Sequence, residues 1–173
     1  DLDVAMGRLP VNTPSEFSAY IGKVRDYEQV GKYDHGSWRS NMLLSADDAM
    51  NGTTKDNTGH TTFAEEIATT LDKLSTTLNF RWNIKKIYLI DYTYDAAGQK
   101  KEASNDLLNL LNQGILMTSY YGHGSKTDWA SEGLLKVGYI PRLNNRGRYT
   151  ILNSFSCTVA RFDDGIGRSL SEE

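Results

Sequence analysis

Three chemically reactive kinds of side chain each follow a short apolar run. They are Cys157, which is the one cysteine in the sequence, His123, and the acids Asp47 and Asp48; the runs before them lie at 149–155, 115–121 and 42–44. If these runs are parallel strands, their carboxyl ends meet at one edge of a sheet, where the side chains can converge. A cysteine–histidine pair is the minimum for thiolate catalysis, because the imidazole takes the thiol proton and later protonates a leaving amine. Glycines on both sides of His123 would leave backbone amides open to a developing oxyanion.

The residue pattern alone leaves simpler interpretations open. A lone cysteine is most often a small buried apolar residue, and a histidine between glycines is often a turn residue. The acids Asp47 and Asp48 could form a solvated turn or, with Asp56 and Asn57, hold a calcium ion. The pattern therefore suggests a hydrolase without establishing one.

Composition narrows the class of protein. The chain has 173 residues, 19 Lys and Arg against 22 Asp and Glu, and 39% hydrophobic residues. We expect a single domain over 1–173, with an N-terminal part at 1–37 and a sheet at 38–173 that carries the histidine and the cysteine. The net charge of −3 argues against a nucleic-acid partner, since phosphate neutralisation needs a clustered basic surface. One cysteine excludes an internal disulfide, and no apolar run is long enough to cross a membrane.

Helical and strand-like segments alternate along the chain. Thr13 and Pro14 predict the start of a helix that runs to about Glu28. Apolar residues at helical spacing predict two further helices, at 63–78 and 103–112, the second ended by Gly114. The predicted strands lie at 38–46, around the apolar run 42–44, and at 84–90, 115–121 and 149–155, with a short β-like run at 4–11 and a loop at 51–59.

This alternation predicts an α/β fold with a mostly parallel sheet and helices on both faces. The sequence lacks an initiator methionine and a signal peptide, and it stops in what resembles the first turn of a helix. We therefore expect a piece of a longer protein, with a fold that is incomplete at both ends.

Three segments together resemble the gingipain-type cysteine peptidases of family C25. The run Gly122-His123-Gly124-Ser125, followed by Trp129, resembles the histidine motif of that family. The segment 154–163, Ser-Phe-Ser-Cys-Thr-Val-Ala-Arg-Phe-Asp, is similar to its cysteine block. The segment 3–14, Asp-Val-Ala-Met-Gly-Arg-Leu-Pro-Val-Asn-Thr-Pro, resembles its opening signature. The three occur in the family's order across nearly the whole chain.

The resemblance implies a caspase-like α/β/α sandwich and a role for each matching residue. Cys157 would be the nucleophile, and His123 the general base and then the general acid. The amides of Gly124 and Cys157 would form the oxyanion hole. Asp47 would be the acid that orients the histidine, with Asp48 as its substitute.

The family also implies a substrate pocket beside the histidine. His60 aligns with the acid at the base of the arginine pocket of the Arg-specific gingipain, so strict arginine specificity is not expected here. Trp129 would wall the pocket, with a place in the core as the alternative. No cofactor is required, although calcium is common in the family and residues 47–57 could hold a structural calcium ion.

Within the family, the segments 157–163 and 128–132 resemble those of the PorU-like sortases of the type IX secretion system. Such a protein would lie at the cell surface, associated with the outer membrane. It would cleave the C-terminal sorting domain from secreted cargo and transfer the new end to an amine, with other secretion-system subunits as partners. The first alternative is a catalytically inactive module with a docking role in a secretion apparatus. The second is an α/β binding domain with a calcium loop.

Overall fold

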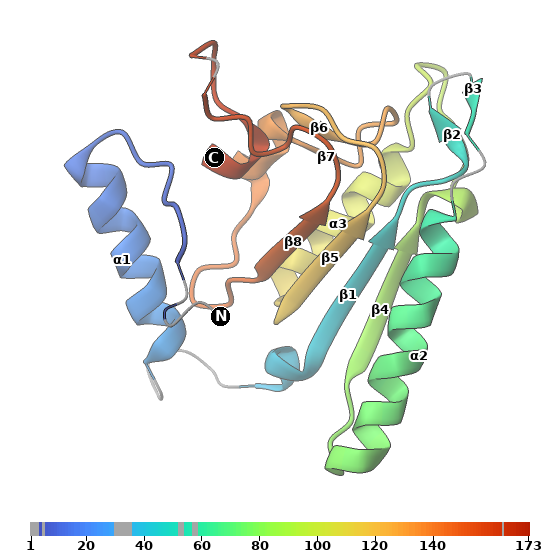
Figure 1. Cartoon of the computed structure of the whole chain (residues 1–173), viewed down its shortest axis with the longest axis horizontal. Helices are drawn as coiled ribbons and strands as arrows, with labels where there is room; N and C mark the ends of the chain where they lie inside the picture. The colour runs from blue at the N-terminus through green and yellow to red at the C-terminus, as the bar shows by residue number, and fades with distance from the viewer. Residues whose placement is uncertain (1–3, 5, 30–35, 52–53, 57–58, 164) are drawn as a thin grey trace.

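A four-stranded parallel sheet forms the centre of the molecule (Figure 1). The computed structural model describes residues 4, 6–29, 36–51, 54–56, 59–163 and 165–173. In spatial order the strands are β4 (Asn83–Tyr88), β1 (Asn41–Ala46), β5 (Met117–Tyr121) and β8 (Ile151–Phe155). The prediction of an α/β fold with a mostly parallel sheet is confirmed, and all four predicted strands are present.

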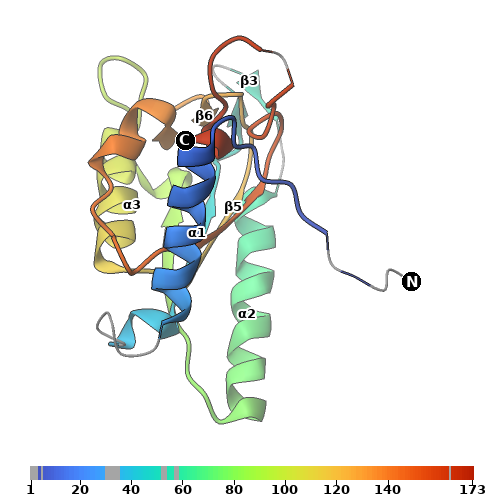
Figure 2. The ribbon, with the colours of Figure 1, turned by 90° about the vertical axis from the view of Figure 1, so that its left-hand side faces the viewer.

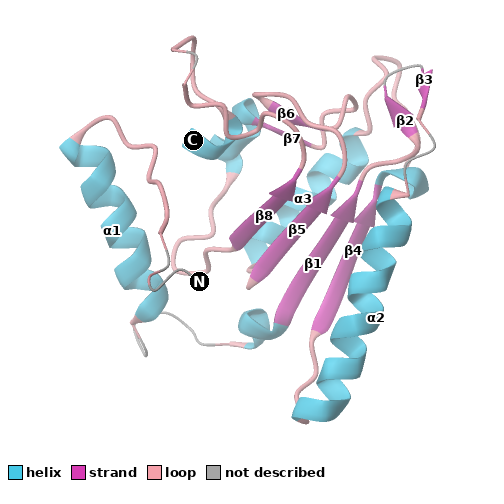
Figure 3. Ribbon diagram, viewed as in Figure 1, coloured by secondary structure: helices cyan, strands magenta, loops and turns pink. Residues whose placement is uncertain are grey.

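Two helices cover opposite faces of this sheet, α2 (His60–Leu78) and α3 (Lys101–Gln113) (Figures 1 and 3). Successive strand residues point to opposite faces. Leu43 accordingly packs in one buried cluster with Leu107 and Leu111 of α3, whereas Leu44 packs in another with Ala64 and Ala68 of α2. Burial on both faces explains why the strand β1 is an almost uninterrupted apolar run.

The ends of the helices agree with the sequence signals. The helix α1 (Pro14–Glu28) begins with a capping box, in which Thr13 accepts from the backbone N–H of Glu16 and the Glu16 side chain accepts from that of Thr13. The helix α3 stops at Gly114, whose φ of 106° favours glycine. Figures 1 and 2 place α1 on the β8 side of the sheet.

The smaller elements depart from the predictions in two places. The ribbon β2 (Met50–Asn51) and β3 (Thr54–Lys55) lies in the stretch predicted as a loop. The β-like run at 4–11 is not a strand in its described residues, 4 and 6–11, because no neighbouring strand pairs with it. Asp3 and Ala5 of the opening signature lie outside the described residues. The other short elements are β6 (Asp128–Trp129), β7 (Leu135–Lys136) and the 3-10 helices η1 (Ser37–Ser40), η2 (Leu89–Asp91), η3 (Val137–Arg142) and η4 (Leu170–Glu172).

Within the described part of the chain, none of the helices has the length and apolar character that a membrane crossing requires.

Candidate active site

The register of the sheet brings the predicted histidine and cysteine to equivalent positions on neighbouring strands. Tyr121, at the end of β5, pairs with Phe155, at the end of β8. His123 and Cys157 each follow two residues later. The Gly122 amide donates to the Phe155 carbonyl over 3.3 Å, which extends the contact between the two segments beyond the strands. A Cβ atom on Gly124 would lie 2.9 Å from the Cys157 carbonyl oxygen, so the loops that carry the pair are in contact.

The ring of His123 pairs with an acid that the sequence analysis did not assign to it. His123 Nε2 contacts Asp56 Oδ2, on the segment that follows β3. The Asp56 amide donates to the Ala49 carbonyl over 3.1 Å, which ties this segment to the end of β1. With Nε2 held by a carboxylate, Nδ1 is the nitrogen that can take a thiol proton. Asp56 lies in the connection between β1 and α2, which starts at the carboxyl end of a strand of the sheet. An acid in such a connection was the signal that could have identified Asp56.

Asp47, the predicted orienting acid, holds the backbone of the histidine rather than its ring. Its Oδ2 accepts from the His123 amide over 2.9 Å, and its own amide donates to the Tyr121 carbonyl over 2.9 Å. Asp47 is fully buried. Burial raises the pKa of its carboxyl from 3.8 to about 6, and the carboxylates of Glu132 and Asp48 act in the same direction. Hydrogen bonds from the His123 and Asp48 amides oppose this rise.

Tyr120 supports the same turn from within the core. Its hydroxyl donates to the His123 carbonyl over 2.7 Å and lies 3.3 Å from Asp47 Oδ2. A single hydroxyl proton serves one acceptor fully, so a protonated Asp47 can donate to Tyr120 in return. Burial raises the pKa of Tyr120, with Asp47 adding to the rise, which keeps the hydroxyl protonated. A Cβ atom on Gly122 would lie 2.5 Å from this hydroxyl and would also overlap Asp47 Cβ, so only glycine fits there.

The cysteine lies at the surface rather than in the core. Cys157 is exposed and follows the last strand, β8. The next residue, Thr158, has a φ of 54°, so the chain turns sharply after the thiol. Gly124 and Trp129 face each other in an antiparallel bridge. The hydrogen bonds of this bridge are made by the neighbouring residues: Ala130 N–H donates to the His123 carbonyl, and Ser125 N–H donates to the Asp128 carbonyl. The bridge thus leaves the Gly124 amide for another acceptor, and the predicted oxyanion hole at Gly124 and Cys157 stays a prediction.

The two predicted pocket residues lie in different environments. His60 begins α2 and packs edge-on against the His123 ring, with 5.3 Å between ring centroids. It also lines a pocket of about 440 Å³. Trp129 instead has no exposed surface and stacks on Tyr120 at 4.5 Å, within the core. It therefore takes the core position that the sequence analysis gave as the alternative to a pocket wall.

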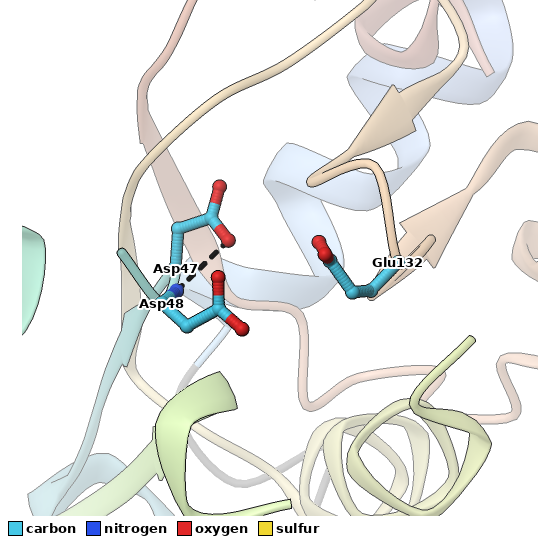
Figure 4. A group of neighbouring side chains, drawn as sticks. All are labelled: Asp47, Asp48 and Glu132. Carbon is cyan, nitrogen blue, oxygen red and sulfur yellow. Dashed lines mark hydrogen bonds between the residues drawn. The ribbon is translucent and has the colours of Figure 1, made fainter. Parts of the chain in front are cut away.

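The acids near β1 are grouped but already have protein partners. Asp47, Asp48 and Glu132 are buried, and one carboxylate oxygen of each lies within 4.8 Å of the others (Figure 4). Lys100 Nζ lies 2.6 Å from Asp48 Oδ2, and the Tyr94 hydroxyl contacts both Asp48 and Glu132.

A calcium ion needs six to eight oxygen ligands. An ammonium group lies against Asp48, and His123 contacts Asp56, so two of the described acids of 47–57 already have protein partners, and the structural calcium ion stays a prediction. Asn57 lies outside the described residues.

The segments that carry His123 and Cys157 thus lie next to each other at the carboxyl edge of a parallel sheet. The model of peptidase family C25 matches residues 1–173, and the chain belongs to that family. No relative was found among curated protein sequences.

Solved structures of this family share the fold. The crystal structure of the Arg-specific cysteine proteinase gingipain R matches with a TM-score of 0.66 and 17% identity, over 90% of this chain and 32% of that one. The complex of the pro- and mature domains of Porphyromonas gingivalis RgpB matches with a TM-score of 0.63 and 18% identity, over 88% of this chain and 32% of that one. The fold is therefore the caspase-like fold of the gingipains, and the chain spans about a third of the length of these structures.

Proposed function

We propose that this chain carries the catalytic pair of a cysteine peptidase. The observation that carries the proposal is the register of β5 and β8, because His123 and Cys157 each lie two residues beyond the paired strand ends Tyr121 and Phe155. His123 Nδ1 takes the thiol proton, and the thiolate attacks the carbonyl carbon of the scissile bond. The C–N bond then breaks, His123 returns the proton to the departing amine, and the acyl group stays on Cys157 as a thioester.

The surrounding residues have separate roles in this mechanism. Asp56 fixes the ring of His123 through Nε2 and stabilises the imidazolium that forms during the reaction. Asp47 and Tyr120 fix the backbone of the same residue at its N–H and C=O groups. The amides of Gly124 and Cys157 receive the oxyanion.

The acyl-thioester has two fates, and we propose the second as the biological one. Water would give proteolysis, and an amine would give transpeptidation. The resemblance of 157–163 and 128–132 to the PorU-like sortases supports transfer. On this proposal the substrate is secreted cargo with a C-terminal sorting domain, and the enzyme works at the cell surface beside other secretion-system subunits.

The rate of Cys157 alkylation by iodoacetamide, measured from pH 5 to 9, tests the pair. Because the thiolate is the nucleophile, we expect rapid labelling below neutral pH that His123→Ala abolishes. Asp72→Asn, at an exposed position on α2, is the control. Labelling that is slow below pH 8 and unchanged by His123→Ala would contradict the peptidase and favour the docking module.

Hydrolysis and transfer are separated by product analysis. A peptide ester that acylates Cys157 is supplied with increasing concentrations of glycinamide, and the acid and amide products are quantified by mass spectrometry. We expect the amide to predominate at millimolar amine. Acid alone at every amine concentration would contradict the transfer proposal and leave the peptidase proposal intact.

A further inference from the structure

The pocket beside His123 has aromatic walls. It measures about 440 Å³, within the range of ligand sites. Phe63 from α2, Tyr121 from β5 and Phe155 from β8 supply three of its sides. Among the described residues, the lining consists of Gly59, His60, Thr62, Phe63, Glu66, Tyr121, Gly122 and Phe155.

The aromatic rings are fixed but not covered. Tyr121 and Phe155 are paired across the parallel strands, and their rings stack at 4.8 Å with only 1° between their planes. The Phe63 ring lies 5.7 Å from that of Tyr121. Phe63 and Phe155 are 57% and 59% exposed. The three rings therefore form an exposed, mostly apolar surface that is stabilised when another flat or apolar group covers it.

The pocket is joined to the proposed catalytic pair through the backbone. Tyr121 precedes His123 by two residues, and Phe155 precedes Cys157 by two. Gly122, between Tyr121 and His123, belongs to the lining itself. A substrate whose carbonyl carbon lies at Cys157 thus has the adjoining side chain on its acyl side within reach of this pocket.

The charge of the lining does not favour a basic side chain. Glu66 is the one carboxylate among the lining residues; it is exposed and stands on the same helix as His60. An exposed carboxylate gives only a weak ion pair, because water and salt screen its charge. The apolar rings offer more surface than this single charge.

We propose that this pocket binds an aromatic or large apolar side chain on the acyl side of the scissile bond, and that Phe63, Tyr121 and Phe155 determine this specificity. The inference rests on the proposed peptidase function and names its substrate class.

The test uses peptidyl chloromethyl ketones that differ only in the residue before the ketone: Phe, Leu, Arg or Asp. Their second-order rates of alkylation of Cys157 are divided by the iodoacetamide rate. We expect Phe to exceed Arg by at least tenfold. Phe63→Ala should remove most of this preference, because it removes one wall. Phe80→Ala is the matched control, since Phe80 is 44% exposed beyond the opposite end of α2 and should leave the preference unchanged.

The outcomes separate the two proposals. Rapid iodoacetamide labelling with equal ketone rates would overturn the aromatic pocket and retain the peptidase. A preference for Arg that Glu66→Gln abolishes would overturn it in favour of an acidic subsite.

A second measurement does not depend on catalysis. Binding of the Phe and Arg peptides, as amides, to Cys157→Ser is followed by NMR. Tighter binding of the Phe peptide, with shifts at the Phe63 ring, supports the pocket even if the thiol is unreactive, and equal binding overturns it.

Discussion

Asp47→Asn should change how the stability of the protein depends on pH. Because burial raises the pKa of Asp47 from 3.8 to about 6, the folded state binds a proton that the unfolded state has already released between these values. The free energy of unfolding therefore falls as pH rises from about 4 to 6. At about 1.4 kcal/mol per pH unit, the interval corresponds to a loss of about 3 kcal/mol. Asparagine has no such proton but can still accept from the His123 amide.

The assay is urea unfolding, followed by circular dichroism, at half-unit steps from pH 4 to 7. Other carboxyls act oppositely, since hydrogen bonds lower the pKa of Glu16, Glu65, Asp95 and Glu172. The informative quantity is thus the free energy of unfolding of the wild type minus that of Asp47→Asn. We expect this difference to fall as pH rises, and it can change sign in favour of the variant. Asp72→Asn, at an exposed site on α2, is the control. A difference that stays constant with pH for Asp47→Asn would refute the assignment of a buried proton to this carboxyl.

Three further changes test the supports of the site. Gly122→Ala should destabilise the fold by about 1–3 kcal/mol in urea unfolding, because its Cβ would meet side-chain atoms of two neighbours. Lys100→Met should lower the free energy of unfolding by about 3–5 kcal/mol, because it leaves the Asp48 carboxylate buried without its cation. Adding Asp48→Asn should recover most of this loss, and equal stability of the single and double variants would contradict the pairing. Asp56→Asn should slow Cys157 alkylation at pH 6 by roughly tenfold, the equivalent of one charge-assisted hydrogen bond, and an unchanged rate would show that the ring contact is not needed.

Capping residues, glycines and the spacing of apolar residues were sufficient to predict most of the helices and strands. The capping residue Thr13 and the glycine at 114 marked the limits of two helices, and apolar spacing identified the third. The strand β1 was found because burial on both faces requires a continuous apolar run. The segment 4–11 misled because extended sequence becomes a strand only where another strand pairs with it, and sequence alone does not show that neighbour.

The sequence predicted that His123 and Cys157 lie at one edge of the sheet, but not which residues contact the histidine. His123 and Cys157 each follow a strand directly, so strand order alone brings them to one edge. Asp56 follows a two-residue strand in a ribbon, and its approach to the His123 ring depends on how that ribbon folds over the edge. Trp129 has the same neighbours in sequence whether it faces a pocket or the core, and only stacking on Tyr120 decides between them.

The two acids next to His123 hold different parts of it, Asp47 the backbone and Asp56 the ring. Asp47 is fully buried, and its bond goes to a backbone amide that does not titrate. Asp56 is partly accessible, and its bond goes to the ring that gains and loses a proton in the proposed mechanism. If one carboxylate did both, each protonation of the ring would disturb the backbone contact that positions it. A buried acid for the backbone and a more accessible acid for the ring avoid that conflict, which is why Asp47→Asn should alter stability against pH while Asp56→Asn should alter thiol reactivity.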